Sequence, residues 1–364
     1  MSRCKLEEFI SYEQPAKYIV DSDQYDDSYE IPVLTAGKSF ILGYTDEKNN
    51  IFDNLPVIIF DDFTTSVQFV DFPFKVKSSA MKLLKNTEQA DIKYCYYLLK
   101  FLQHTPENHK RQWLSATSQN IVELPTIEKQ KNIVRKLDKI LEVIDNQNKQ
   151  LELLDEAIKA RFVEMFGDPI ENQKDWEVVK IRDIVTDVRY GTSKPAVEGG
   201  RYPYLRMNNL TVDGGLDLSD LKYIDIPNNE IEKCVVLKGD ILFNRTNSID
   251  LIGKTAVFNL LDDMVIAGYI IRIRLNNQIL PDVFSQYMNL ETMKKVLRGM
   301  AKGAVNQANI NAQELQNIKV YIPNMELQKQ YVEFKEEIDK SRLRELLAIK
   351  QIKLLLHDSW FLFY

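Results

Sequence analysis

Apolar residues recur at alternating spacings of three and four along two long stretches of the chain, residues 126–165 and 324–360. This spacing puts them on one face of a helix and is typical of a coiled-coil seam. Neither stretch contains proline or glycine, and a helix of forty residues is about 60 Å long. We call the two predicted helices the rod helices. Their seam residues are Ile133, Leu137, Ile140, Ile144, Leu151, Leu154 and Ile158 in the first and Tyr331, Ile338, Ile349, Ile352 and Leu356 in the second.

A long amphipathic helix needs another surface on which to bury its apolar face. Because the two seams are long and match in position, we predict that the rod helices pair with each other within the chain. Gln147 interrupts the first seam, and Lys335, Arg342 and Glu345 weaken the second. The alternative is that each rod helix packs on its own globular region.

The opening of each rod helix is an internal repeat. Residues 123–131 recur as 321–329, so that a proline, a glutamate, a glutamine and a lysine coincide at a constant separation of 198 residues. Residues 176–181 also echo residues 4–10. The repeat therefore predicts that the chain consists of two similar units in tandem, in the order globular region, rod, globular region, rod.

These features predict an α+β fold with a pseudo-two-fold repeat. The predicted segments are a globular region at 1–125, a rod at 126–165, a linker at 166–175, a second globular region at 176–323 and a second rod at 324–360. Gly167 and Pro169 are expected to end the first rod. We predict strands at 57–60, 74–76, 240–243, 255–258 and 269–275, and helices at 92–101 and 282–297.

The composition is that of a globular protein, with 364 residues, 45% of them hydrophobic and 27% charged. The chain has no apolar run long enough to span a bilayer, and the residues after Met1 do not resemble a signal peptide. Its cysteines, Cys4, Cys95 and Cys234, lie far apart, which fits a cytoplasmic protein. We expect no membrane association and no metal site. The net charge of −6 means that any nucleic-acid binding must rely on local basic patches or on partners.

The motifs of self-contained catalysis are missing from the sequence. It has no G-x-G, no P-loop, no H-E-x-x-H and no G-x-S-x-G. It also lacks the Pro-Pro pair of an adenine methyltransferase motif, and its Glu-x-Lys at 333–335 falls on a rod helix. We therefore expect a chain that binds and does not catalyse.

Loops of the second globular region concentrate the side chains that proteins use to contact DNA. Arginine binds guanine edges, asparagine and glutamine bind adenine edges, and lysine, serine and threonine suit phosphates. Each loop alone could equally be a solvated turn, and the arginines of the strand at 269–275 could pair with acids. The candidates are Arg189, Tyr190, Thr192, Ser193, Lys194, Arg206, Asn208, Asn209, Asn244, Arg245, Thr246, Asn247, Ser248, Lys254, Arg272, Arg274, Asn306, Gln307 and Asn309.

The first globular region has fewer such residues. An acidic run at 21–27 would repel DNA and is expected to face away from it, or to form a solvated or partner-facing loop. The candidate DNA contacts here are Thr35, Lys38, Thr64, Thr65, Ser66, Lys75 and Lys77.

The order of globular and rod segments resembles the specificity (S) subunit of type I restriction–modification enzymes, and the likeness covers nearly the whole chain. It is carried by residues 191–195, 204–209, 239–248, 253–255 and 306–311, by the repeated rod openings, and by residues 165–169. Residues 31–37 and 72–76 resemble a different class of target recognition domain.

The resemblance implies that each target recognition domain reads one half of a bipartite, asymmetric site in double-stranded DNA. The rod helices would form an antiparallel coiled coil that gives the chain its pseudo-two-fold symmetry and sets the unread gap. They would also recruit two methyltransferase (M) subunits and the restriction (R) motor-nuclease subunits around one S subunit. S-adenosylmethionine would then bind to M, and ATP and Mg²⁺ to R, with no cofactor on this chain. Two alternatives remain open: a coiled-coil scaffold with protein-binding globular regions, and a self-contained nuclease–methyltransferase.

Overall fold

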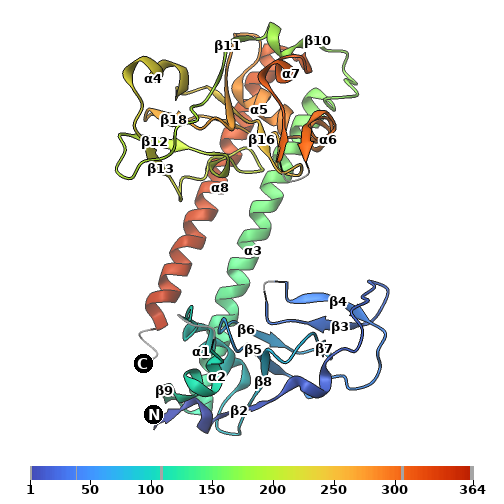
Figure 1. The fold of residues 1–364 in the computed structure, drawn as a ribbon, viewed down its shortest axis with the longest axis vertical. Coiled ribbons are helices and arrows are strands. Elements are labelled where there is room, and N and C mark those ends of the chain that lie inside the picture. The colour runs from blue at the N-terminus through green and yellow to red at the C-terminus, as the bar shows by residue number, and fades with distance from the viewer. Residues whose placement is uncertain (1, 38, 107–109, 305–306, 361–364) are drawn as a thin grey trace. The chain divides into compact units, whose positions relative to one another are not determined.

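The computed structural model describes residues 2–37, 39–106, 110–304 and 307–360 (Figure 1). Its contacts divide the chain into unit 1, Met1–Asn146 with Ala348–Tyr364, and unit 2, Gln147–Leu347. Each unit holds a globular region and part of both long helices, α3 (Ile127–Phe166) and α8 (Met325–Trp360). These bounds lie within one residue of those predicted for the rod helices.

Unit 1 is mixed α/β. A four-stranded antiparallel sheet has the order β2-β8-β5-β6, a three-stranded sheet the order β4-β3-β7, and β1 pairs with β9. The elements are β1 (Ser2–Lys5), β2 (Ile10–Glu13), β3 (Ile31–Leu34), β4 (Ile41–Thr45), β5 (Val57–Asp61), β6 (Val67–Val70), β7 (Lys75–Val76), β8 (Met81–Asn86), α1 (Ile92–Phe101), α2 (Gln112–Ser115) and β9 (Ile121–Leu124).

The main core of unit 1 joins the four-stranded sheet, α1 and the first turns of α3. Helix α1 has the bounds predicted for it, and the side chain of its N-cap, Asp91, accepts hydrogen bonds from two backbone N–H groups of the first turn. Ile133 and Leu137 of the predicted seam are buried in the same cluster as Leu98 of α1, and Leu356 of α8 packs against it. In this unit the seam residues therefore pack on the globular region as well as on a rod helix.

Unit 2 is also mixed α/β. Its two four-stranded sheets have the orders β11-β19-β15-β17 and β13-β12-β18-β14, the short β16-β21-β20 sheet follows, and β10 pairs with β22. The elements are β10 (Glu177–Lys180), β11 (Val185–Tyr190), β12 (Tyr202–Leu205), β13 (Lys222–Ile224), α4 (Asn228–Cys234), β14 (Val235–Val236), β15 (Ile241–Asn244), β16 (Thr246–Asn247), β17 (Thr255–Val257), β18 (Met264–Ile266), β19 (Ile270–Leu275), α5 (Pro281–Asn289), α6 (Glu291–Met300), β20 (Lys302–Ala304), β21 (Gln307–Asn309), α7 (Ala312–Gln316) and β22 (Lys319–Ile322).

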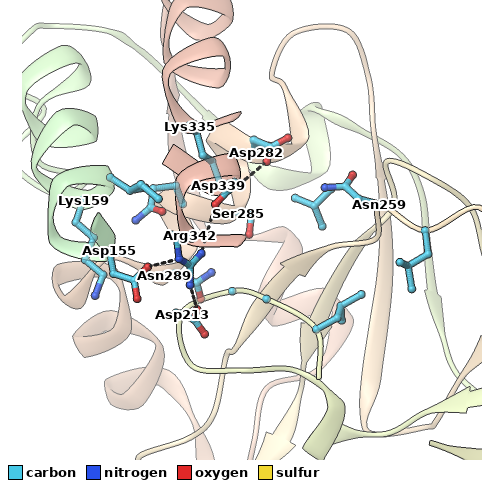
Figure 2. Close-up of a pocket in the computed structure, with 17 residues that line it drawn as sticks. Asp155, Lys159, Asp213, Asn259, Asp282, Ser285, Asn289, Lys335, Asp339 and Arg342 are labelled. Atoms are coloured by element: carbon cyan, nitrogen blue, oxygen red, sulfur yellow. Dashed lines mark hydrogen bonds and ion pairs between the residues drawn. The ribbon is translucent and has the colours of Figure 1, made fainter. Parts of the chain in front are cut away.

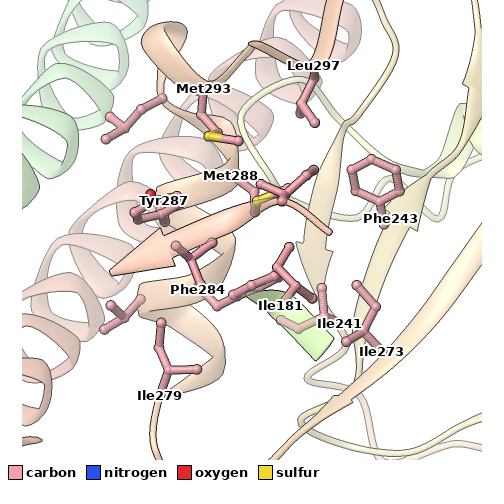
Figure 3. Packing of buried hydrophobic residues seen from close by; sticks show 14 of the residues in the cluster. Ile181, Ile241, Phe243, Ile273, Ile279, Phe284, Tyr287, Met288, Met293 and Leu297 are labelled. Atoms are coloured by element: carbon pink, nitrogen blue, oxygen red, sulfur yellow. The ribbon is translucent and has the colours of Figure 1, made fainter. Parts of the chain in front are cut away.

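The core of unit 2 lies between the β11-β19-β15-β17 sheet and helices α5 and α6 (Figure 3). The single helix predicted for 282–297 is wrong, because the chain is extended at Leu290, with φ −65° and ψ 145°. The side chain of Asn289 accepts a hydrogen bond from Thr255 N (3.2 Å) and donates one to Thr255 O (2.6 Å). This pairing with β17 ends α5 and lets Leu290 turn into the core, where it is buried.

The repeated sequence corresponds to a repeated piece of structure. In unit 1, β1 pairs antiparallel with β9, which leads through Pro125 into α3. In unit 2, β10 pairs antiparallel with β22, which leads through Pro323 into α8. After β1 and after β10 the chain makes a short 3-10 turn with one buried apolar residue, Leu6 or Ile181. The repeat thus builds the same attachment between each globular region and the rod helix that leaves it.

Within unit 2, the second half of α3 packs antiparallel against the first half of α8. The ring of Phe162 lies 5.4 Å from that of Tyr331, the guanidinium of Arg161 lies 5.8 Å from the ring of Phe334, and Arg342 contacts Asp155 further along. Every predicted seam residue of both rod helices is buried or half-buried, whereas the neighbouring leucines Leu343, Leu346 and Leu347 are exposed.

The segment predicted as a linker, 166–175, is fastened to unit 2. Gly167 has φ +83° and its N–H donates to Val163 O (2.8 Å), so it ends α3 as predicted. The last carbonyls of a helix have no partner within it and need other donors. Trp176 Nε1 donates to the last of them, Phe166 O (2.8 Å). Two further aromatic side chains hold the segment that follows the helix, since Tyr321 OH donates to Gly167 O (2.8 Å) and Tyr287 OH donates to Pro169 O (3.1 Å).

Candidate nucleic-acid interface

Several of the predicted loops of unit 2 converge on one depression of about 570 Å³, which we call the cationic depression. They follow β11, β12 and β15 and precede β19, so the ends of four strands position the side chains. Gly191 enables one close approach, because a Cβ there would lie 2.2 Å from Ile266 O. The lining residues are Thr192, Ser193, Lys194, Pro195, Ala196, Tyr204, Arg206, Met207, Asn208, Lys222, Arg245, Ala267, Gly268 and Tyr269.

Arg245 is the cation of this depression that is held in place without a carboxylate. Its backbone N–H donates to Tyr269 O (2.9 Å), and its guanidinium lies 5.0 Å from the ring centre of Tyr190, a cation–π arrangement. Its side chain also donates to Gly268 O at 3.3 Å. Within the described parts of the chain it forms no ion pair, and its Nε has no hydrogen-bond partner. Arg245 is therefore a preoriented donor that a phosphate or a guanine edge could engage.

The other cations of the depression are paired at its rim. Lys194 Nζ lies 2.9 Å from Glu230 Oε1, and Arg206 Nη2 lies 2.7 Å from Asp220 Oδ2. The hydrogen bond from Arg206, with the charge of Lys222, lowers the pKa of Asp220. Ion pairs this exposed are weak, so a phosphate could replace either carboxylate at little cost.

Four predicted contacts of this region are buried supports of the loops. Lys254 Nζ donates to Met207 O (2.7 Å) and Leu210 O (2.5 Å), and burial lowers its pKa. Asn209 accepts from Arg206 N (2.9 Å), which fixes the turn that presents Arg206. The side chains of Asn244 and Thr246 are also turned inward. As direct DNA contacts these four residues, Asn209, Asn244, Thr246 and Lys254, are corrected: their polar atoms are used inside the fold.

The expectation of a cationic strand face at Arg272 and Arg274 is also corrected. Arg272 is 1% exposed, and it donates to Asp187 Oδ2 (2.6 Å) and to the carbonyls of Glu232 and Val235. Arg274 Nε donates to Asp240 Oδ1 (2.9 Å). Both guanidinium groups are neutralised by acids, which is the alternative that the sequence left open.

The remaining candidates of unit 2 surround the depression or lie near it. Arg189 and Tyr190 are exposed at the end of β11, although Arg189 contacts Asp187 (2.8 Å). Asn247, Ser248 and Asn309 are half-buried, and Thr246 Oγ1 donates to Asn309 Oδ1 (3.0 Å). Gln307 is exposed in β21, and Asn306 lies outside the described residues.

The described candidates of unit 1 differ in how far they are buried. Thr64 is exposed, Thr35 and Ser66 are half-buried, and Lys38 lies outside the described residues. Two candidates are corrected because they are buried: Thr65 Oγ1 donates to His104 O (2.6 Å), and Lys75 Nζ pairs with Glu47 Oε2 (2.7 Å).

One residue of the acidic run contacts a candidate cation of unit 1. Asp23 forms an ion pair with Lys77, one of the candidate phosphate contacts of unit 1. Asp23 therefore neutralises a cation that the sequence offered as a phosphate contact.

Three lining residues of the cationic depression with a charged or aromatic polar side chain were not among the predicted contacts: Tyr204, Lys222 and Tyr269. Lys222 lies in β13 and carries no motif that could have singled it out. Tyr269 is 49% exposed although it directly precedes a buried strand. The signal available in the sequence was the aromatic residue itself, since aromatic rings stack on bases.

A second polar pocket, of about 270 Å³, lies in unit 2 where α3 and α8 meet the globular region (Figure 2). Arg342 contacts Asp155 (3.0 Å), Asp213 (3.0 Å) and Asp339 (3.3 Å), and Lys335 contacts Asp339 (2.7 Å) as well. Lys335 and Arg342 occupy the seam positions that weaken the apolar pattern of the second rod. Since these charges satisfy one another, the pocket ties both rod helices to the loop at Asp213.

Among the described residues, no group of His, Cys, Asp or Glu is arranged to hold a metal ion.

Comparison with known proteins decides the family. A family model described as the type I restriction modification DNA specificity domain matches residues 173–354. The type I restriction enzyme EcoR124I/EcoR124II specificity subunit of Escherichia coli is 31% identical over 363 residues, covering 92% of this chain and 85% of the relative. The chain belongs to the family of type I restriction–modification specificity subunits. The resemblance seen in the sequence is thereby confirmed.

Solved structures of low sequence identity share the fold of this specificity subunit. The type I restriction–modification S subunit from M. genitalium superposes with a TM-score of 0.57 at 13% identity, covering 97% of this chain and 93% of that one. A chain from a structure of type I R-M complex assembly and conformational transition gives 0.56 at 15% identity, covering 97% and 95%. Members of the family are non-catalytic subunits that recognise DNA by sequence, and this is the role of the specificity subunit described here. Within the described residues, no helix is both long and apolar enough to cross a membrane.

Proposed function

We propose that the specificity subunit reads a bipartite, asymmetric site, with the globular region of each unit acting as a target recognition domain for one half. The observation that carries the proposal is the repeated attachment of two globular regions whose loops differ. Similar β-strand pairs lead into similar rod openings, whereas the candidate loop residues of the two globular regions differ in sequence and in burial. Two different readers on one repeated frame favour two different half-sites over a palindrome.

The rod helices are proposed to pair as an antiparallel coiled coil that sets the unread gap. The antiparallel contacts of α3 and α8 within unit 2 support this, as does the burial of seam residues in both units. One extra heptad lengthens a helix by about 10 Å. Inserting a heptad between Leu141 and Ile144, with a matching one between Ile349 and Ile352, is therefore expected to change the gap or abolish recognition. A variant that methylates the original site at the original rate would contradict the ruler.

The partners are proposed to supply the chemistry. One S subunit would assemble with two M subunits, which bind S-adenosylmethionine and methylate adenine N6, and with R subunits, which use ATP and Mg²⁺. The absence of catalytic motifs from the sequence supports this division, and the net charge of −6 fits a chain that shares its phosphate contacts with partners.

Mapping methylated adenines tests the proposal directly. Single-molecule sequencing of genomic DNA from cells that express the chain with its M partner is expected to return one motif with two unlike halves and a fixed gap. Binding by the assembled complex should also weaken by about 10³–10⁵ between 50 and 200 mM salt if six to ten phosphates are contacted. A flat salt response and no motif would favour the protein-binding scaffold instead.

A further inference from the structure

A buried glutamine occupies the first turn of each rod helix. Gln130 in α3 and Gln328 in α8 are both 0% exposed, and they are equivalent positions of the sequence repeat. A buried primary amide is costly unless all its polar atoms find partners. The partners of these two side chains therefore indicate why the repeat keeps a glutamine here.

In unit 1 the amide of Gln130 joins three backbone groups. Its Nε2 donates to Pro125 O (2.8 Å), just before α3, and to Gln89 O (3.1 Å). Its Oε1 accepts from the backbone N–H of Asp91 (2.8 Å), the N-cap of α1. The start of α3 is thus bonded to the start of α1.

In unit 2 the amide of Gln328 makes the same three contacts. Its Nε2 donates to Pro323 O (2.8 Å), just before α8, and to Gln278 O (3.0 Å). Its Oε1 accepts from the backbone N–H of Leu280 (2.8 Å), the N-cap of α5. We call each set of three bonds a glutamine latch.

The glutamine latch does not depend on the side chains of the globular region. It contacts only backbone atoms, so it survives although the N-cap is Asp91 in one unit and Leu280 in the other. Each latched helix packs on a sheet of its own globular region, α1 on β5, β6 and β8 and α5 on β17 (Figure 1). The latch therefore connects the sheet, through one helix, to the first turn of the rod.

We propose that Gln130 and Gln328 are positioning residues that fix the orientation of each rod helix on its own globular region, and that this orientation sets the gap the complex accepts. The inference rests on the ruler role proposed above. A rotation of about 5° at one end of a rod of about 60 Å displaces the other end by roughly 5 Å. That exceeds the roughly 3.4 Å rise of one base pair, so a loose attachment would admit neighbouring gaps.

The test uses the assembled methyltransferase complex with Gln130→Met or Gln328→Met. Duplexes carry the two half-sites found by methylation mapping, with the native gap or with one base pair more or fewer. Methionine keeps the size of the side chain and removes all three bonds. For each variant, the ratio of methylation rates between the native and the altered gap is expected to fall about tenfold, or about 1.4 kcal/mol. The bases preferred within each half-site should stay unchanged.

Matched variants separate positioning from general loss of stability. Leu83→Ala in unit 1 and Met264→Ala in unit 2 remove buried side chains from core clusters that contain no residue of a rod helix, and they should lower the thermal midpoint while keeping the gap preference. Gln150→Met, at an exposed position of α3, should change neither. If a methionine variant does not assemble, Gln→Asn at that position shortens the side chain and the same ratio is measured.

The outcomes are distinguishable. A glutamine variant that keeps the wild-type ratio, or a core variant of equal instability that relaxes the gap as much, overturns the role of the latch and leaves the proposed function intact. A changed half-site preference in a glutamine variant overturns it as well. If the wild-type complex itself accepts all three gaps equally, the ruler fails, and the latch inference fails with it.

Discussion

Unit 1 and unit 2 bury lysines in different ways. In unit 1, Lys82 Nζ lies 2.9 Å from Asp62 Oδ2, and both side chains are 1% exposed. In unit 2, Lys294 Nζ donates to Gly253 O (2.5 Å) and Asn289 Oδ1 (2.7 Å), and no carboxylate pairs with it within the described residues. The first arrangement neutralises the buried charge, whereas the second uses a lysine amino group without a carboxylate partner to hold a turn.

The same difference extends to the surfaces proposed to meet DNA. Lys77 of unit 1 is paired with Asp23, while Arg245 of unit 2 has an aromatic ring and a carbonyl as neighbours and no ion pair within the described chain. A repeated frame thus carries one face whose described candidate cations, Lys75 and Lys77, are paired with acids, and one whose central cation, Arg245, is available. The attachment to the rod helices and the DNA-facing loops can therefore change independently: the attachment is repeated in both units, whereas the loops differ.

The largest expected effect comes from breaking the buried pair of unit 1. Lys82→Met leaves the Asp62 carboxylate buried without its cation, which costs about 3–5 kcal/mol in the free energy of unfolding. Asp62 Oδ1 also accepts from the backbone N–H of Trp113 (2.9 Å), so Trp113 fluorescence in urea denaturation reports the loss. Lys17→Met, at an exposed pair with Glu13, is the control and should leave the midpoint in place. An equal midpoint for both variants would mean that the buried pair does not stabilise unit 1.

A smaller effect is expected from the available cation of unit 2. Arg245→Ala should weaken binding of the assembled complex to its specific site by about 1–3 kcal/mol, the scale of one base contact. The stability of unit 2 should hardly change, because no buried acid is left unpaired. Lys77→Ala should change specific binding less, since Asp23 already occupies that ammonium group. Competition binding on matched duplexes measures both, and equal losses would remove the distinction between the two faces.

Much of the frame could be predicted from periodicity and repetition. The rod helices, the helix at 92–101 and the end of α3 at Gly167 follow from local patterns, which act over a few turns of the chain. The break at Leu290 could not be predicted, because it depends on Asn289 reaching the backbone of Thr255, a strand far away in the sequence.

The candidate contacts were harder to predict for the same reason. Arg272 alternates with isoleucines, which is the pattern of an exposed cation on a half-buried strand. In the fold it is buried and pairs with Asp187, which lies 85 residues earlier in the sequence. Lys75 of β7 is likewise paired with a residue from another part of the chain, Glu47. Sequence identifies residues able to contact DNA; the fold decides which of them are already used.

The smallest expected effect concerns pH and distinguishes the two ways of burying lysine. Burial lowers the pKa of Lys294 to about 7, and the nearby charges of Arg298 and Lys254 act in the same direction while Glu291 opposes them. Below that pKa both the folded and the unfolded chain carry the proton, and the cost of burying the charge is present in full. Between about 7 and the ordinary value of 10.5, only the unfolded chain stays protonated, so stability rises with pH.

The rise is at most about 1.4 kcal/mol per pH unit for one proton. It is measured by urea denaturation at pH 7, 8 and 9 with Trp176, packed against the core of unit 2, as the only tryptophan after Trp113→Phe and Trp360→Phe. Lys294→Met should flatten the rise, and Lys295→Met, the exposed neighbour, should keep it. Because the carboxylate partner distinguishes Lys82 from Lys294, the Lys82→Met change in unit 1 should not alter the slope that Trp176 reports. If the unfolding free energy of Lys294→Met still rises with pH as in the wild type, another group titrates. Lys294 and Lys82 would then not differ in the way proposed here.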